Sequence, residues 1–231
     1  MDLARHSFPP KPLRLAGVPV PMVGHVRMYV CGITPYDVTH LGHAATYIWA
    51  DAVDRVLSWH GYGVTVARNV TDVDEVLFAE AQRRGESPTM LATLQRASFE
   101  GTMATLKVRV PDENPTAAQA VGHVLQLASA LLAREAAYVG ADGSVFARTS
   151  SAAERAGLDY DTALRLSTEY RDHPDHPEKE HPFDVAVWVA TDEGEVSWPS
   201  PWGDGRPGWH AECAAMVLSL FGPTVDIHAG G

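Results

Sequence analysis

Residues 31–43, CGITPYDVTHLGH, join the two patterns that decide the fold. The apolar run at 27–31 predicts a buried strand, and apolar residues recur at helical spacing from 41 to 59. Gly61 is typical of a helix end, and residues 63–68 alternate as a second strand does. A strand, a helix and a strand within about forty residues form one βαβ unit, which predicts a parallel sheet.

The remaining pattern predicts that this core is interrupted and then resumed. The expected elements are helices over 88–136, a short strand within 140–148, a strand at 184–190, a helix at 209–222 and a strand at 224–228. We therefore expect an α/β protein with a Rossmann-like parallel sheet core and a mostly helical insertion. Its expected parts are an N-terminal extension at 1–26, the first half of the nucleotide-binding core at 27–110, the insertion at 111–182 and the start of the second half at 183–231.

The composition is that of a soluble globular chain, with 231 residues, 45% hydrophobic and 20% charged. No apolar run approaches the ~20 residues of a membrane span, and residues 1–12 lack the apolar region of a secretory signal. A cytoplasmic protein with no membrane partner is expected. The formal net charge of −11 disfavours a chain whose whole surface binds nucleic acid.

The pair His40 and His43 lies where strand and turn give way to the helix. Amides at a helix N-terminus attract anions, and Gly42 lets a ligand approach the backbone. Imidazoles there can donate hydrogen bonds to phosphate oxygens, although two surface histidines can also occur together by chance. Thr34 and Thr71 end the two predicted strands, where open α/β sheets bind ligands and where hydroxyls also cap turns.

Cys31 and Cys213 are the two cysteines of the chain, 182 positions apart. Without signs of secretion, they are expected to be free thiols or metal ligands rather than a disulfide. Each on its own reads as a small core residue, and their spacing does not define a zinc site. His210 shares a helix face with Cys213. Trp209 on its own is typical of core packing, whereas the Gly-rich stretch before it favours a backbone that closes over a ligand.

Four stretches taken together carry a family resemblance: YVCGITPYDVTHLGH, NVTDVDE, GRPGWHAEC and DIHAGG. In order and spacing they resemble the class I cysteinyl-tRNA synthetase family, from about residue 27 to the last residue. Within that family, GITPYDVTHLGHAATY and SWPSPWGDGRPGWHAECAA look like the mycothiol-pathway cysteine ligases, whereas synthetases proper more often read GPTVYD and HxGNAR. The resemblance implies a class I synthetase-type (HUP) Rossmann-like core.

The resemblance also implies a reaction and its residues. Cysteine would be activated by ATP to cysteinyl-AMP and joined to the amine of glucosaminyl-inositol in mycothiol biosynthesis, with Zn²⁺ on the substrate thiolate and Mg²⁺ with ATP. It implies zinc ligands Cys31 and Cys213 and catalytic His40 and His43. The positions that match the ATP and cysteinyl-adenylate site are Cys31, Gly32, Ile33, Thr34, His40, Leu41, Gly42, His43, Thr46, Asn69, Val70, Thr71 and Trp209.

Departures from the family pattern give further expectations. The family continues with a histidine zinc ligand and a KMSKS-type lysine loop, neither of which occurs in these 231 residues, and AGG stands where GGG is usual. We therefore expect a C-terminally incomplete core, an N-terminal fragment with negligible adenylation alone, and weak zinc binding, with His210 or His228 as substitute ligands. The stretch EYRDHP (169–174) fits a Gly-Asp-Pro motif of the ligases poorly.

The partners implied are the small-molecule substrates L-cysteine, ATP and glucosaminyl-inositol, with a monomeric full-length form. Two other readings remain open. One is a catalytic fragment of a cysteinyl-tRNA synthetase. The other is a non-catalytic remnant that binds a nucleotide or zinc.

Overall fold

The computed structural model describes residues 14–15, 17–19 and 24–230. Most of the expected extension at 1–26 lies outside these residues. Its described part contains a short antiparallel hairpin, β1 (Arg14–Leu15) with β2 (Val18–Pro19). Within the described part of the chain, no helix has the length and apolar character needed to cross a membrane.

The βαβ unit predicted around residues 31–43 is confirmed. β3 (Val26–Ile33), α1 (Leu41–Trp59) and β4 (Val64–Val70) follow one another, and β9 (Ile227–Ala229) adds a third parallel strand in the order β4-β3-β9. β4 runs two residues beyond the predicted 63–68, so Asn69 and Val70 belong to the strand and not to the loop after it.

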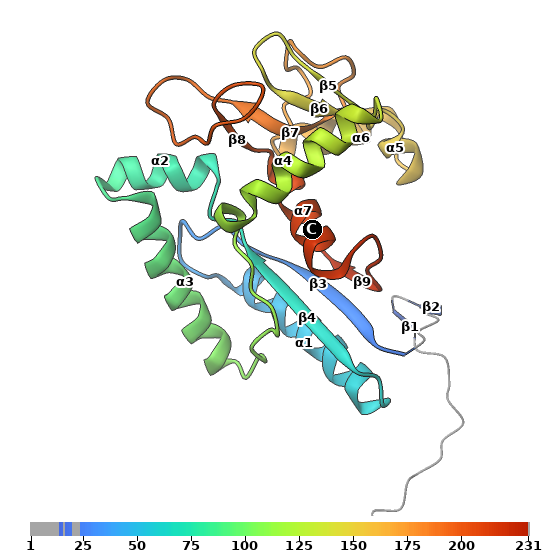
Figure 1. Ribbon diagram of the computed structural model, residues 1–231. Helices are drawn as coiled ribbons and strands as arrows, with labels where there is room; N and C mark the ends of the chain where they lie inside the picture. Colours follow the sequence, from blue (N-terminus) through green and yellow to red (C-terminus); the bar gives the residue numbers. More distant parts are fainter. Residues whose placement is uncertain (1–13, 16, 20–23, 231) are drawn as a thin grey trace, which may run out of the picture.

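The two faces of the parallel sheet are covered by different helices (Figure 1). Met28 and Val30 of β3 point to the side of α1 and α3 (Pro88–Thr105), where they pack with Tyr47. Tyr29 points to the opposite side, where it packs with residues of α4 (Ala117–Ala133) and α7 (Trp209–Phe221). This alternation follows from the two-residue period of a strand and buries both faces.

The helical stretch expected at 88–136 is broken in the structure. After α2 (Glu75–Arg84), which Asp74 caps through the amide of Val76, α3 ends at Thr105 and α4 begins at Ala117. The segment 106–116 instead runs beside β4 and makes isolated parallel bridges to it. Pro111 and Pro115 have no amide hydrogen and disfavour helix here.

Residues 111–182 are mostly helical, as expected, but their two short strands join a sheet that continues to residue 207. Besides α4, α5 (Ala152–Arg155) and α6 (Tyr160–Glu169), the region from 134 to 208 forms a four-stranded antiparallel sheet in the order β5-β6-β7-β8. Its strands are β5 (Ala137–Val139), β6 (Val145–Ala147), β7 (Val185–Ala190) and β8 (Gly205–Pro207).

The strand predicted at 184–190 is therefore present as β7, but it pairs antiparallel with β6 and β8 and does not belong to the parallel core. Apolar periodicity identifies a strand, whereas its partners are set by packing that the periodicity does not encode. Trp188 of β7 is fully buried against α4 and α7. Helix α7 thus lies between the two sheets (Figure 1) and contacts β7 on one side and β3 on the other.

Candidate functional site

The carboxyl ends of β3 and β4 bring together the two segments singled out from the sequence. The amide of Gly32 donates to Oδ1 of Asn69 at 2.8 Å, and Nδ2 of Asn69 donates to the hydroxyl of Thr71 at 3.2 Å. The amide of Thr71 in turn donates to the carbonyl of Ile33 at 2.9 Å. Asn69 and Thr71 are buried polar side chains, and each is paired here. Residues 31–34 and 69–71 therefore form one rigid edge of the sheet.

The two histidines lie at the start of α1, as predicted. His40 caps the helix, its Nδ1 accepting from the amide of Gly42 at 3.1 Å, and its ring stacks on His43 with centroids 3.9 Å apart. Acceptance at Nδ1 leaves the proton of a neutral His40 ring on Nε2, where it can be donated outward. Burial, aided by the neighbouring His40, lowers the pKa of His43, so its ring is neutral near pH 7. The side chain of Leu41 is exposed, and the hydroxyl of Thr46 donates to the carbonyl of Gly42.

The two cysteines meet although 182 residues separate them. Their Sγ atoms lie 4.0 Å apart, and Nε2 of His228 lies 3.4 Å from Sγ of Cys31. Both are free thiols. The hydrogen bond between the thiols lowers the pKa of Cys31, and the same contact together with burial raises the pKa of Cys213. Cys31 is therefore the first of the pair to ionise.

These distances bear on the zinc expectation. A tetrahedral zinc, with Zn–S near 2.3 Å and Zn–N near 2.0–2.1 Å, spaces such ligand atoms by about 3.5–3.8 Å. The Cys31–Cys213 and Cys31–His228 separations are close to that spacing. Even so, the described residues contain no group of three or more His, Cys, Asp or Glu arranged to hold a metal. The residues present therefore supply two thiolate ligands for a soft metal, Cys31 and Cys213, and the imidazole of His228 lies beside Cys31.

Helix α7 begins at Trp209, and two features fix that start. The amide of Gly208 donates to the carbonyl of Val187 at 3.0 Å, and a Cβ at Gly208 would lie 1.9 Å from the carbonyl oxygen of Ala186. Only glycine allows so close an approach to β7. Trp209 is 40% exposed, so it is not a core residue, and its ring lies 5.3 Å from that of His210.

His210 contacts a residue that the sequence did not suggest. Its Nε2 lies 2.9 Å from Oδ1 of Asp172, and this carboxylate raises the pKa of His210. Although His210 and Cys213 share a helix face, the imidazole of His210 is thus engaged with the 171–173 loop.

Three other side chains at this site read as ordinary positions in the sequence. Tyr47 belongs to the apolar stripe of α1, yet its hydroxyl donates to the carbonyl of Cys31 at 3.3 Å. Arg68 is only 7% exposed and lies over the ring of Tyr47. Glu212 is fully buried, neither carboxylate oxygen has a partner among the described residues, and burial raises its pKa well above the usual value. A glutamate within the apolar run AECAAMVLSLF was the available signal for Glu212.

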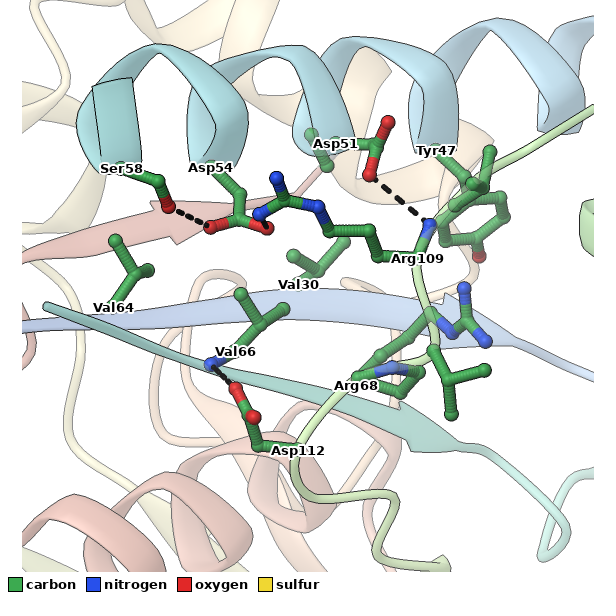
Figure 2. Close-up of a pocket in the computed structure, with 14 residues that line it drawn as sticks. Val30, Tyr47, Asp51, Asp54, Ser58, Val64, Val66, Arg68, Arg109 and Asp112 are labelled. Atoms are coloured by element: carbon green, nitrogen blue, oxygen red, sulfur yellow. Dashed lines mark hydrogen bonds and ion pairs between the residues drawn. The ribbon is translucent and has the colours of Figure 1, made fainter. Parts of the chain in front are cut away.

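Two cavities flank the sheet. The larger, about 170 Å³, lies on the α1 side beside the beginning of β4, and no residue singled out from the sequence lines it. Figure 2 shows that its three carboxylates, Asp51, Asp54 and Asp112, each contact a partner on another segment. Arg109 contacts Asp54 at 2.8 Å, and Asp112 accepts from the amide of Val66 at 2.7 Å. These contacts fasten the 108–112 segment to α1 and β4.

The smaller cavity, about 100 Å³, lies beside Trp209 and the Asp172–His210 pair. It is bounded by the start of α2, the 171–173 loop, β7, β8 and the start of α7. Asp74, on its wall, accepts from the hydroxyl of Thr34 at 3.4 Å, and burial raises the pKa of Asp74. This cavity therefore borders the sheet edge that carries the predicted ligand-binding residues.

Comparisons with known proteins agree with this arrangement. Residues 19–231 match the family described as tRNA synthetases class I (C) catalytic domain. The L-cysteine:1D-myo-inositol 2-amino-2-deoxy-alpha-D-glucopyranoside ligase of Mycolicibacterium vanbaalenii is 44% identical over 219 residues, covering 92% of this chain and 51% of the relative. The cysteine–tRNA ligase of Dehalococcoides mccartyi is 43% identical over 208 residues, covering 90% and 45% respectively. The chain spans about half the length of the curated relatives it matches.

A solved structure shares the fold. Mycobacterium tuberculosis methionyl-tRNA synthetase in complex with methionyl-adenylate superposes with a TM-score of 0.63 at 14% identity, covering 87% of this chain and 48% of that one. This likeness shows the fold, and the family match over residues 19–231 carries the assignment that the sequence motifs indicated. The chain belongs to the family of class I (C) tRNA synthetase catalytic domains, whose members are ligases.

Proposed function

We propose that this chain belongs to an ATP-dependent cysteine ligase that activates L-cysteine as cysteinyl-AMP. The observation that carries the proposal is the approach of Cys31 and Cys213 to 4.0 Å beside the carboxyl ends of parallel strands. Open α/β sheets bind their ligands at that edge, and thiolates are the ligands that a soft metal prefers.

Cys31 and Cys213 would hold the metal, and zinc, when bound, supplies a soft Lewis acid for the substrate thiolate. Serine has no thiolate, so this arrangement selects cysteine where a polar pocket would discriminate less. The hydroxyl of Tyr47 holds the carbonyl of Cys31, which fixes the backbone that carries one sulfur. Gly32 and Asn69 fix the adjoining strand end in the same way.

The start of α1 would receive the phosphates of ATP. Its unpaired amides carry partial positive charge, and Nε2 of His40 is free to donate. His43, kept neutral by burial, adds a second donor or acceptor without a competing charge. No protein nucleophile is needed, because the cysteine carboxylate attacks the α-phosphorus of ATP itself and pyrophosphate leaves. Positioning and electrostatic stabilisation then supply the rate.

For the second substrate we propose the amine of glucosaminyl-inositol. The ligase-like stretches of the sequence and the net charge of −11 favour a small amine over a polyanionic tRNA. The alternative, transfer to tRNA, uses the same activated cysteine. Product analysis with both acceptors distinguishes the two.

The test of cysteine activation is a binding measurement, because the chain spans about half of its relatives. A non-hydrolysable cysteinyl-adenylate analogue and its seryl counterpart are titrated calorimetrically with and without zinc. We expect the cysteinyl analogue to bind at least about tenfold more tightly, and only with zinc. Cys213→Ser should abolish the difference, whereas the neighbouring exposed Ala214→Ser should leave it unchanged. Equal binding of both analogues would refute the proposal.

A further inference from the structure

The larger cavity, on the α1 side of the parallel sheet, is not lined by the residues that the sequence assigns to cysteine activation. We propose that it binds a small monocarboxylate with an apolar body and that Arg68 receives the carboxylate. This inference goes beyond the proposed function and does not depend on it.

Arg68 is the charged side chain of this cavity that lacks an acceptor. The residue is only 7% exposed, and no hydrogen bond or ion pair joins its guanidinium to another of the described residues. Figure 2 shows the guanidinium beside Tyr47 without a dashed contact, whereas Asp54 and Asp112 each have one. Because a guanidinium carries five N–H donors, this one needs acceptors from a molecule in the cavity.

Two aromatic rings hold the guanidinium in place. Its Cζ lies 5.4 Å from the ring centroid of Tyr47 and 5.0 Å from that of Phe99. The faces of these rings attract the cation, but they leave its in-plane donors free. The amide of Arg68 donates to the carbonyl of Glu113 at 2.9 Å, which fixes the backbone that carries the side chain. The donors are therefore positioned before a ligand arrives.

The carboxylates that line the cavity are engaged elsewhere. Asp54 contacts Arg109 at 2.8 Å, Asp112 accepts from the amide of Val66 at 2.7 Å, and Asp51 accepts from the amide of Arg109 at 3.1 Å. These contacts leave the guanidinium described above without a direct counter-ion. The negative charge of the three carboxylates also disfavours a phosphate dianion, whereas a monocarboxylate brings a single charge to a single cation.

The carboxylate on the other side of Arg68 does not serve it either. Glu100 of α3 acts on Arg68 through its charge, but it is paired with Arg96 at 2.9 Å. Burial lowers the pKa of Arg68, because desolvation outweighs these neighbouring charges. An anion bound in the cavity would offset that cost.

The rest of the cavity suits an apolar body. Val30, Val64 and Val66 of the parallel sheet line it together with Val108, and all four belong to or pack against the hydrophobic cluster under α1 and α3. The cavity opens to solvent beside Val110, which is 88% exposed. Its volume of about 170 Å³ is close to that of an apolar cavity of about 150 Å³ that takes up benzene. The expected ligand therefore has a carboxylate and about five to six carbons.

The test is a calorimetric titration of the 231-residue chain with 3-methylbutanoate and three reference compounds: its amide, acetate and inorganic phosphate. We expect 3-methylbutanoate to bind at least about tenfold more tightly than each reference. The amide lacks the charge, acetate lacks the apolar body, and phosphate carries excess charge. Arg68→Met should lower the affinity for 3-methylbutanoate to that for the amide. Arg134→Met, at an exposed arginine outside the cavity, should leave it unchanged.

A second variant covers the case in which Arg68→Met fails to fold. Val108→Phe keeps the guanidinium and fills the cavity from its apolar wall, so it should abolish binding of 3-methylbutanoate. The site is refuted if the wild-type chain binds the acid no better than its amide, or if either folded variant binds the acid as wild type does. Equal or tighter binding of acetate or phosphate refutes the ligand class. No measurement here involves cysteine or ATP, so the failure of this proposal and that of the proposed function are separate results.

Discussion

Gly32 and Asn69 lie so close that a Cβ at Gly32 would be 1.5 Å from the carbonyl oxygen of Asn69. The hydrogen bond from the amide of Gly32 to the Asn69 side chain requires this approach. The end of β3 therefore has room for glycine alone, and the alignment of residues 31–34 with 69–71 depends on it.

Gly32→Ala should lower the free energy of unfolding by about 3 kcal/mol or more, because the backbone of β3 or β4 must move. The measurement is urea denaturation. Gly122→Ala is the matched control: this exposed glycine in α4 has nothing within 4 Å of its added Cβ, and the change should stabilise by up to about 1 kcal/mol. Equal stability of Gly32→Ala and wild type would show that the two strand ends are not tightly packed.

Metal binding should depend on the sulfur pair. We expect Cd²⁺ or Zn²⁺ to bind weakly, with thiolate charge-transfer absorption for Cd²⁺, and Cys31→Ser or Cys213→Ser to remove the signal. His228→Ala tests whether the imidazole beside Cys31 contributes; a several-fold loss of affinity would make it a ligand. Zinc that resists a chelator and is stoichiometric in the purified chain would contradict the expectation of weak binding.

The Asp172–His210 contact predicts a pH dependence of stability. Because the folded pKa of His210 lies above its usual 6.5, the contact stabilises fully below about pH 6.5 and is lost as pH rises through the folded pKa. The stability difference between wild type and His210→Asn should therefore shrink from pH 6 to pH 8, measured by urea denaturation. His43, whose pKa is lowered, is present in both proteins and cancels in the difference. A difference that is constant across this range would exclude the ion pair.

Buried Glu212 predicts a second pH dependence of stability. Its folded pKa is raised far above 4.5, so the folded chain holds a proton that the unfolded chain releases, and stability falls as pH rises above about 4.5. Glu212→Gln removes this dependence and should be more stable than wild type at pH 7, with a gain that vanishes near pH 4. Exposed Glu193→Gln should change neither value. A destabilised Glu212→Gln at neutral pH would mean that the carboxylate is charged and paired in solution.

The local parts of this structure could be predicted from the sequence, and the parts set by distant packing could not. The limits of α1 follow from its apolar spacing. The antiparallel partners of β7 do not follow, because an apolar strand is compatible with either sheet. The Asp172–His210 contact does not follow either, because it depends on a left-handed backbone at Arg171 and His173, which such residues rarely adopt. In the sequence Tyr47 fits an ordinary core position, and only the structure shows its hydroxyl donating to the carbonyl of Cys31.

Helix α7 is a stiff rod of 13 residues that belongs to two hydrophobic layers at once. Ala211 and Ala215 pack with Trp188 of the antiparallel sheet, while Met216 packs with Tyr29 of the parallel sheet. Cys213 lies between these contacts. The position of the Cys213 sulfur therefore depends on how both sheets pack against this one helix.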